Sequence, residues 1–180
     1  MRMFLLRLCP PNVNPVIWES DEFMDPTPDR APIIAPPPLL GLACIGMAFL
    51  AEHFKPLPIF ETKGTLPVVF GALLIVISAA IIISARSVFI AHDTYLNPYR
   101  PTNAVVVTGV YRFSRNPIYI AFLFVVLAFA LFANSFWFVL FDAILFVMLH
   151  FGVVKREEAY LSGKFGDSYN EYRCLVRRWL

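Results

Sequence analysis

Residues 108–119 read TGVYRFSRNPIY, and this polar stretch leads into an apolar stretch that runs to Ala133. Proline disfavours helix at the residue before it and suits the first turn of a helix, so a helix is predicted to begin at or just after Pro117. Arg112 and Arg115 are therefore expected at the boundary between water and a membrane span. A guanidinium there can hold a carboxylate or a phosphate through paired hydrogen bonds.

The composition indicates an integral membrane protein. Apolar residues make up 58% of the 180 residues, and 18 of them are phenylalanine. Soluble domains usually contain about 45 to 50% apolar residues. The length predicts one domain, and the net charge of +2 gives no sign of a nucleic-acid partner.

Four apolar stretches are predicted to cross the membrane, namely residues 36–54, 66–85, 118–133 and 136–154. Only Asn134 and Ser135 separate the last two stretches, which predicts an antiparallel helical hairpin. Small residues in the second stretch, such as Gly71 and Ser78, are expected to let a neighbouring helix approach closely.

The two ends of the chain differ from these spans. Residues 1–32 contain six prolines and are predicted to form an irregular tail, with residues 33–180 as a single membrane domain. Near the other end, apolar residues recur at spacings of three or four, which predicts interfacial amphipathic helices divided at Gly163 and Gly166. The apolar residues of that face are Leu161, Phe165, Tyr169, Tyr172, Val176 and Trp179. The predicted fold class is an all-α integral membrane protein with about four transmembrane helices.

Residues that could bind metal are few and badly spaced. The three histidines and three cysteines show no metal-ligand pattern, so no metal site is predicted. Asp142 lies near the middle of the last span, where a carboxylate must face protein, water or a partner. The sequence leaves open whether Asp142 makes a packing hydrogen bond or contributes to a polar site.

Two separated motifs carry a family resemblance. The first is G-x-Y-R-x-x-R-N-P-x-Y over residues 109–119, and the second is E-E-x-x-L-x-x-x-F-G-x-x-Y-x-x-Y over residues 157–172. Together with the hairpin between them, they resemble the isoprenylcysteine carboxyl methyltransferase family, which shares its cofactor-binding half with the phospholipid methyltransferases. The resemblance covers residues 94–180 and includes Arg178 and Trp179 near the end of the family pattern. Asn116 stands where many members have histidine, and asparagine can both donate and accept hydrogen bonds there.

The resemblance implies a methyltransferase that uses S-adenosylmethionine and no metal. The implied acceptor is a lipophilic small molecule or a prenylated or lipid substrate at the bilayer, methylated on a carboxylate. Arg115 and Glu157 are the implied catalytic residues. Cofactor binding is predicted for Tyr111, Arg115, Asn116, Pro117, Tyr119, His150, Glu157, Glu158, Tyr169 and Tyr172. His150 is included because seven residues separate it from Glu157, a spacing that places both on one face of an α-helix.

Three other interpretations remain open at this point. The chain could be a phospholipid N-methyltransferase, which shares the same cofactor-binding half. It could be a membrane reductase similar to the sterol reductases, whose C-terminal halves look alike but use NADPH. It could also be a non-catalytic membrane protein that keeps the motifs for packing. Binding of S-adenosylhomocysteine or of NADPH distinguishes these interpretations.

The distribution of basic residues predicts the orientation in the membrane. Thirteen of the 15 lysines and arginines fall on one side of a four-span arrangement, and that side is cytoplasmic by the positive-inside rule. Both termini and the active site are therefore predicted to be cytoplasmic. Reporter domains fused after Phe60 and after Ser135 are expected to report the opposite side. A cytoplasmic signal at either fusion would overturn this multi-pass topology.

Overall fold

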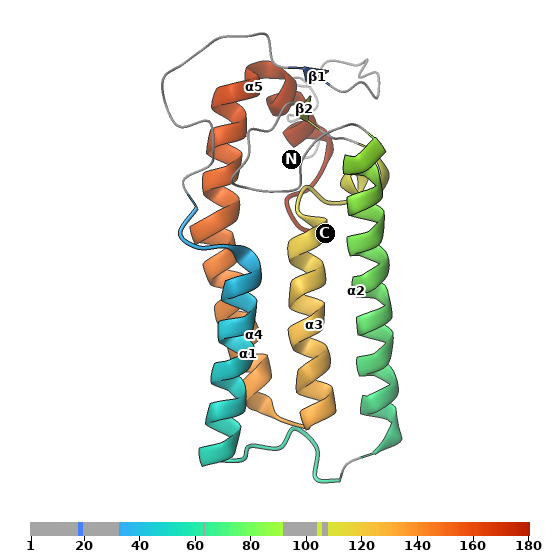
Figure 1. Ribbon diagram of the computed structural model, residues 1–180, viewed down its shortest axis with the longest axis vertical. Helices are drawn as coiled ribbons and strands as arrows, with labels where there is room; N and C mark the ends of the chain where they lie inside the picture. Colours follow the sequence, from blue (N-terminus) through green and yellow to red (C-terminus); the bar gives the residue numbers. More distant parts are fainter. Residues whose placement is uncertain (1–17, 20–32, 63, 92–103, 106–107) are drawn as a thin grey trace, which may run out of the picture. The chain divides into compact units, whose positions relative to one another are not determined.

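A computed structural model describes residues 18–19, 33–62, 64–91, 104–105 and 108–180 (Figure 1). Most of the predicted tail and residues 92–103 lie outside the described residues. The elements are β1 (Trp18–Glu19), α1 (Pro37–Phe54), α2 (Thr65–Ala91), β2 (Ala104–Val105), the 3₁₀-helix η2 (Gly109–Arg112), α3 (Pro117–Ala133), α4 (Phe136–Met148), the π-helix η3 (Leu149–Val154) and α5 (Lys155–Leu175). β1 and β2 pair antiparallel.

Four apolar helices occupy the predicted spans. The stretches Pro37–Phe54 and Thr65–Val88, and the long helix that begins at Phe136, have the length and composition needed to cross a membrane. α3 has 17 residues, about 25 Å of helix, which is the lower end of the range for a span. The predicted class, an all-helical integral membrane protein, is confirmed. α2 continues to Ala91, beyond the predicted end at Ala85.

The chain forms two compact units. One comprises residues 1–32, 84–117 and 156–180 and is called the motif unit, because both sequence motifs fall almost wholly within it. The other comprises residues 33–83 and 118–155 and is called the bundle unit.

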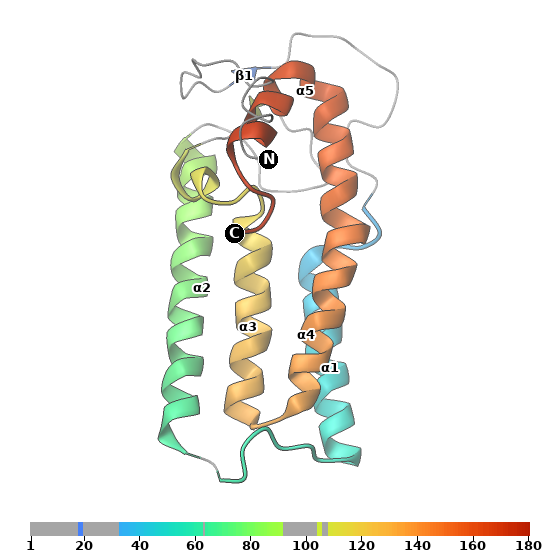
Figure 2. The same cartoon turned by 180° about the vertical axis from the view of Figure 1, so that it is seen from behind.

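Prolines and one short polar turn set the helix boundaries of the bundle unit. α1 has proline in its first turn, and α3 begins at Pro117, where a missing N–H leaves no helical hydrogen bond unmade. Asn134 and Ser135 separate α3 from α4, and the two helices run antiparallel (Figures 1 and 2). The predicted C-terminal hairpin is therefore present.

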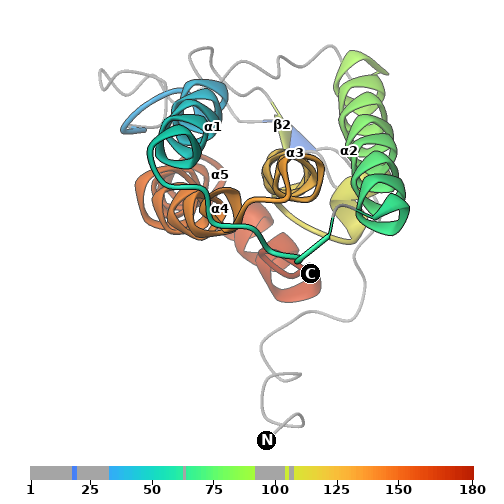
Figure 3. The ribbon, with the colours of Figure 1, turned by 90° about the horizontal axis from the view of Figure 1, so that it is seen from below.

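The best-packed pair of helices in the bundle unit is α1 and α4, which lie side by side (Figure 3). The buried residues Ala48, Ala130 and Phe138 form a core that α3 also contributes to. The rings of Phe49 and Phe138 meet edge to face with centroids 4.9 Å apart, a favoured aromatic geometry.

α2 meets α3 through a small residue, as the sequence predicts. A Cβ atom added to Gly71 would lie 2.6 Å from the ring of Phe132, so only glycine fits there without a shift of the ring. Ser78, seven residues on, is also buried, and its hydroxyl donates to the carbonyl of Leu74 at 2.7 Å. Most large apolar residues of α2 are exposed, as expected of a lipid-facing helix.

A network of polar contacts joins the α1–α2 loop to the α3–α4 turn. Asn134 has a φ of 52°, and its side-chain amide accepts from the N–H of Phe60 and donates to the carbonyl of Phe60, both at 2.9 Å. The hydroxyl of Ser135 donates to Glu52 at 2.6 Å. The indole of Trp137 donates to the carbonyl of Lys55 at 2.7 Å. The loop and the turn therefore meet at the same end of the bundle unit, as a four-span arrangement requires.

A π-helical segment, Leu149–Val154, interrupts the helix that follows Asp142. Its hydrogen bonds span five residues instead of four, so seven residues no longer make two turns. The spacing argument that placed His150 and Glu157 on one face therefore does not hold. The His150 ring lies against Phe146 and Phe151, with centroids 6.0 and 4.7 Å away.

The same π-helical segment binds the chain just before α1. The carbonyl of Gly152 accepts a hydrogen bond from the N–H of Ile34 at 3.3 Å. A Cβ atom on Gly152 would lie 2.8 Å from the Ile34 side chain, so the close approach depends on glycine.

Asn134 supports a stability prediction. Replacement by glycine keeps the positive φ free of strain but removes two hydrogen bonds, and about 1 to 3 kcal/mol of stability is expected to be lost. Replacement by alanine loses the same bonds and adds roughly 1 to 2 kcal/mol of backbone strain. Thermal unfolding in detergent should therefore rank the native protein above Asn134→Gly, and Asn134→Gly above Asn134→Ala. Equal melting temperatures for the native and glycine proteins would contradict the role of the amide.

Candidate functional site

The first motif folds as a tight turn in the motif unit. Gly109 has a φ of 61°, and a Cβ atom there would lie 2.6 Å from the Val88 side chain, so this position needs glycine for two independent reasons. The 3₁₀-helix Gly109–Arg112 follows and buries Tyr111. The backbone then brings Ser114, Arg115 and Asn116 to the centre of the unit.

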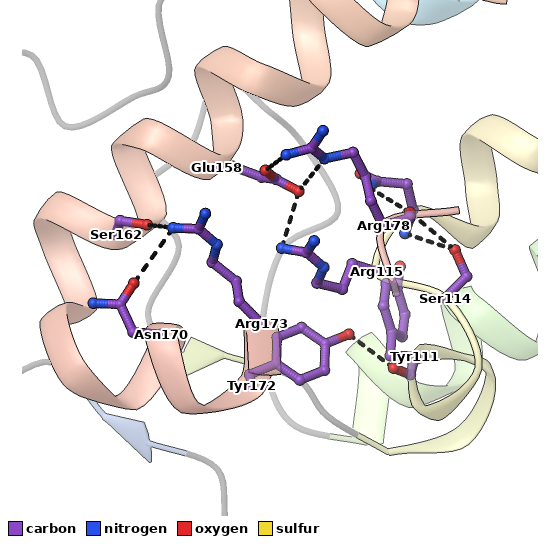
Figure 4. Close-up of polar contacts among 10 residues, drawn as sticks. Tyr111, Ser114, Arg115, Glu158, Ser162, Asn170, Tyr172, Arg173 and Arg178 are labelled. Carbon is purple, nitrogen blue, oxygen red and sulfur yellow. Dashed lines mark hydrogen bonds and ion pairs between the residues drawn. The ribbon is translucent and has the colours of Figure 1, made fainter. Parts of the chain in front are cut away.

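The second motif supplies a buried carboxylate. Glu158 lies on α5, and its side chain is only 7% exposed. Its two oxygens accept from the guanidinium of Arg178, with Nε donating to Oε1 at 2.9 Å and Nη2 donating to Oε2 at 2.7 Å (Figure 4). This is the paired geometry in which a guanidinium binds a carboxylate most strongly. These hydrogen bonds raise the pKa of the Arg178 guanidinium.

Arg115 is the second guanidinium at Glu158, and its contact is of another kind. Its Nη1 lies 3.0 Å from Oε1 of Glu158, and its side chain is 9% exposed. Neither Nε nor Nη1 of Arg115 makes a hydrogen bond to any described residue. Two guanidiniums thus share one carboxylate, and the cluster carries a surplus positive charge. Buried donors without acceptors are costly, so the arrangement fits an anionic group that is bound from outside.

The end of the chain is bound to the first motif through backbone carbonyls. The N–H of Arg115 donates to the carbonyl of Arg177 at 3.0 Å. The carbonyl of Arg178 accepts from the side chains of Asn116 at 2.9 Å and Ser114 at 3.3 Å. Asn116 therefore uses its side-chain amide N–H to bind the backbone of Arg178.

Gly166 bends α5 and brings its second half to the first motif. Its φ of 53° and ψ of −123° are not helical, so the predicted division into two helices is present at Gly166. The helix continues through Gly163, where the predicted break is absent. Arg173, beyond the bend, donates to the hydroxyl of Ser162 at 3.2 Å (Figure 4). The buried residues Phe165, Tyr169 and Tyr172 form an apolar cluster at the bend.

Three buried tyrosines surround the charged cluster. The hydroxyl of Tyr172 donates to the carbonyl of Tyr111 at 2.8 Å, which joins the two motifs. Burial raises the pKa of Tyr169 to about 12, and the charge of Glu158 acts in the same direction while Arg115 opposes it. Burial also raises the pKa of Tyr111 and Tyr172, and the charge of Glu157 adds to the shift of Tyr111. All three tyrosines therefore remain neutral hydrogen-bonding groups at neutral pH.

Most of the predicted site residues belong to this one unit. The motif unit contains Tyr111, Arg115, Asn116, Pro117, Glu157, Glu158, Tyr169 and Tyr172. Tyr119 and His150 belong to the bundle unit, and their cofactor role stays a prediction. Arg178 and Ser114 were not among the predicted site residues. The resemblance at Arg178 and Trp179, near the end of the family pattern, pointed to Arg178. No sequence signal pointed to Ser114.

The described residues contain no group of three or more histidine, cysteine, aspartate or glutamate side chains that could hold a metal ion. Within this part of the chain, the polar chemistry of the motif unit rests on arginines, carboxylates and tyrosines.

Fold and site together define a helical membrane protein whose motif unit contains a buried cluster of arginines, a carboxylate and tyrosines. Comparison with known proteins places it more closely: a model of the phospholipid methyltransferase family matches residues 66–168. The match covers more than half of the chain, and the chain belongs to that family. It includes Arg115 and the two glutamates but stops before Tyr169, Tyr172 and Arg178.

Similarity to individual proteins is more limited. An uncharacterized protein of Haemophilus influenzae is 59% identical over 27 residues, which cover 15% of this chain and 43% of that protein. The match thus spans less than half the length of that relative. No solved structure matches the chain.

Proposed function

We propose that this membrane methyltransferase takes its methyl group from S-adenosylmethionine and transfers it to a carboxylate of a lipophilic acceptor. Membership of the methyltransferase family supports the reaction class. The observation that carries the proposal is Arg115, a buried guanidinium whose Nη1 lies 3.0 Å from Glu158 and whose Nε has no acceptor among the described residues. A carboxylate of the cofactor can accept from that Nε–H.

The neighbouring residues fit the other polar parts of such a cofactor. Glu158 already receives Arg178 on both oxygens and Arg115 on one, so little acceptor capacity remains on it. Glu157, whose charge acts on Tyr111, is the better candidate for an amino or ribose hydroxyl group. The buried tyrosines Tyr169 and Tyr172 supply apolar walls with neutral hydroxyl groups.

The chemistry of the two acceptor classes differs in its protons. When bound, S-adenosylmethionine supplies an electrophilic methyl group on a sulfonium. A carboxylate acceptor forms an oxygen–carbon bond as the carbon–sulfur bond breaks, the electron pair goes to sulfur, and no proton has to leave. An ammonium acceptor must first lose a proton to a base. Positioning and charge complementarity are therefore sufficient for the carboxylate.

A second acceptor class is favoured by the family match itself. The family is described by methylation of phospholipids, so a lipid amine is the alternative acceptor. In that reaction Glu157 is the residue of the motif unit best suited to take the proton, since a carboxylate is a general base.

The product distinguishes the two acceptors. Purified protein in bilayer nanodiscs is given S-adenosylmethionine labelled on the methyl group, with either a prenylated cysteine or phosphatidylethanolamine. We expect the label in the prenylated cysteine, in a form released as methanol by alkali, because methyl esters hydrolyse and N-methyl groups do not. Alkali-stable label in phosphatidylethanolamine would establish the amine acceptor instead.

The cofactor class is tested separately from the acceptor. Calorimetry in detergent should show binding of S-adenosylhomocysteine and none of NADPH. Binding of NADPH alone would replace the proposal by the reductase interpretation. Binding of neither would favour a non-catalytic protein.

Arg115→Lys tests the role of the guanidinium. Lysine keeps the positive charge but loses the planar pair of donors. Affinity for S-adenosylhomocysteine is expected to fall about tenfold to hundredfold, which corresponds to losing one charged hydrogen bond. Affinity for 5′-methylthioadenosine, which lacks the amino acid part, should not change.

Two other results would reassign Arg115. A loss of turnover at saturating cofactor, with unchanged affinity for S-adenosylhomocysteine, would place Arg115 at the acceptor or the transition state. Full activity and full affinity would leave Arg115 as an interfacial anchor. Arg177→Lys is the matched control, because the Arg177 side chain is exposed and only its carbonyl contacts the first motif.

A further inference from the structure

Arg115 and Arg178 compete for the same carboxylate. Both guanidiniums lie within 3.0 Å of Glu158, yet only Arg178 makes the paired hydrogen bonds to it. The carboxylate can bind one guanidinium in the paired geometry at a time, since both of its oxygens are then used. Arg115 makes only a single contact with the carboxylate, through Nη1, and its Nε has no acceptor among the described residues.

Arg178 forms the paired hydrogen bonds because its backbone is held close to the first motif. Its carbonyl accepts from Asn116 and Ser114, so the residue is fixed beside the first motif whatever its side chain is. Its side chain is 29% exposed and reaches Glu158 from the edge of the cluster. Arg115, with a side chain only 9% exposed, is the more buried of the two. The arrangement leaves the unbonded Nε on the guanidinium that lies deeper.

We propose that Arg178 is a positioning residue that occupies both oxygens of Glu158, keeps Glu158 from forming paired hydrogen bonds with Arg115, and so leaves the Nε donor of Arg115 open for the cofactor carboxylate. The inference rests on the proposed cofactor. Without the Arg178 side chain, Glu158 turns its paired oxygens to the adjacent Arg115, because a buried carboxylate needs the strongest partner in reach. The protein's own glutamate then occupies the place of the cofactor carboxylate.

Arg178→Ala is the direct test. The backbone contacts of residue 178 with Asn116 and Ser114 do not involve its side chain, so the chain end remains docked. We expect affinity for S-adenosylhomocysteine, measured by calorimetry in detergent, to fall about tenfold to hundredfold, the equivalent of one charged hydrogen bond. Affinity for 5′-methylthioadenosine should stay at the native value, because this compound has no carboxylate for Arg115 to bind.

A second substitution should reverse part of the loss. Glutamine at position 158 is neutral and cannot hold Arg115 as a carboxylate does. The double variant Arg178→Ala with Glu158→Gln is therefore expected to bind S-adenosylhomocysteine more tightly than Arg178→Ala alone. A purely structural role predicts the opposite, since a second lesion in one cluster would weaken binding further.

Two more variants complete the design. Arg178→Lys keeps the charge but cannot form the paired contact, and an intermediate loss is expected, which serves as the test if the alanine variant does not fold. Arg177→Ala is the matched control, because it removes a neighbouring exposed guanidinium and keeps the backbone bond to Arg115. Melting temperatures of all variants show whether folding has changed.

The outcomes separate the inference from the proposed function. If the native protein binds no S-adenosylhomocysteine, the proposed function fails and the inference fails with it. If the native protein binds it and Arg178→Ala binds it equally well, only the inference is overturned. Parallel loss of both ligands, or a double variant weaker than Arg178→Ala, would likewise show that Arg178 only stabilises the fold.

Discussion

The buried carboxylate of Glu158 is the constraint on which the motif unit depends. A charge removed from water needs close partners of opposite charge, and an uncompensated one costs several kcal/mol. Its partners come from Arg115 in the first motif and from Arg178 near the other end of the chain. Segments more than 40 residues apart must therefore meet at one point. The bend at Gly166 and the backbone bonds of residues 177 and 178 follow from this requirement.

Much of the fold could be predicted because the signals are local. Prolines, a two-residue polar turn and apolar length gave the helices of the bundle unit within a few residues at most boundaries. The π-helical segment Leu149–Val154 could not be predicted, because the surrounding apolar residues suit an α-helix equally well. Gly163 shows the same limit, since one glycine inside a helix is tolerated at a cost of about 1 kcal/mol and its neighbour Gly166 already supplies the bend.

The sequence predicted which residues the candidate site contains better than it predicted which of them bind one another. Motif spacing identified the residues that share the motif unit. Spacing does not show which of two arginines forms the paired hydrogen bonds with a glutamate. That choice depends on side-chain geometry and on a chain end 20 residues away from Glu158. Asn116 is a similar case: its amide could face a ligand or the backbone, and only the position of the Arg178 carbonyl decides between them.

The contacts between Asn134 and Phe60 also bear on how the membrane part assembles. The loop after α1 leaves the backbone N–H and carbonyl of Phe60 without a helical partner, and both are bound by a side chain from the turn between α3 and α4. A chain inserted in order from its N-terminus makes the first pair of helices well before Asn134 is available. The hydrogen bonds between Asn134 and Phe60 therefore form late, once the second pair of helices has packed beside the first.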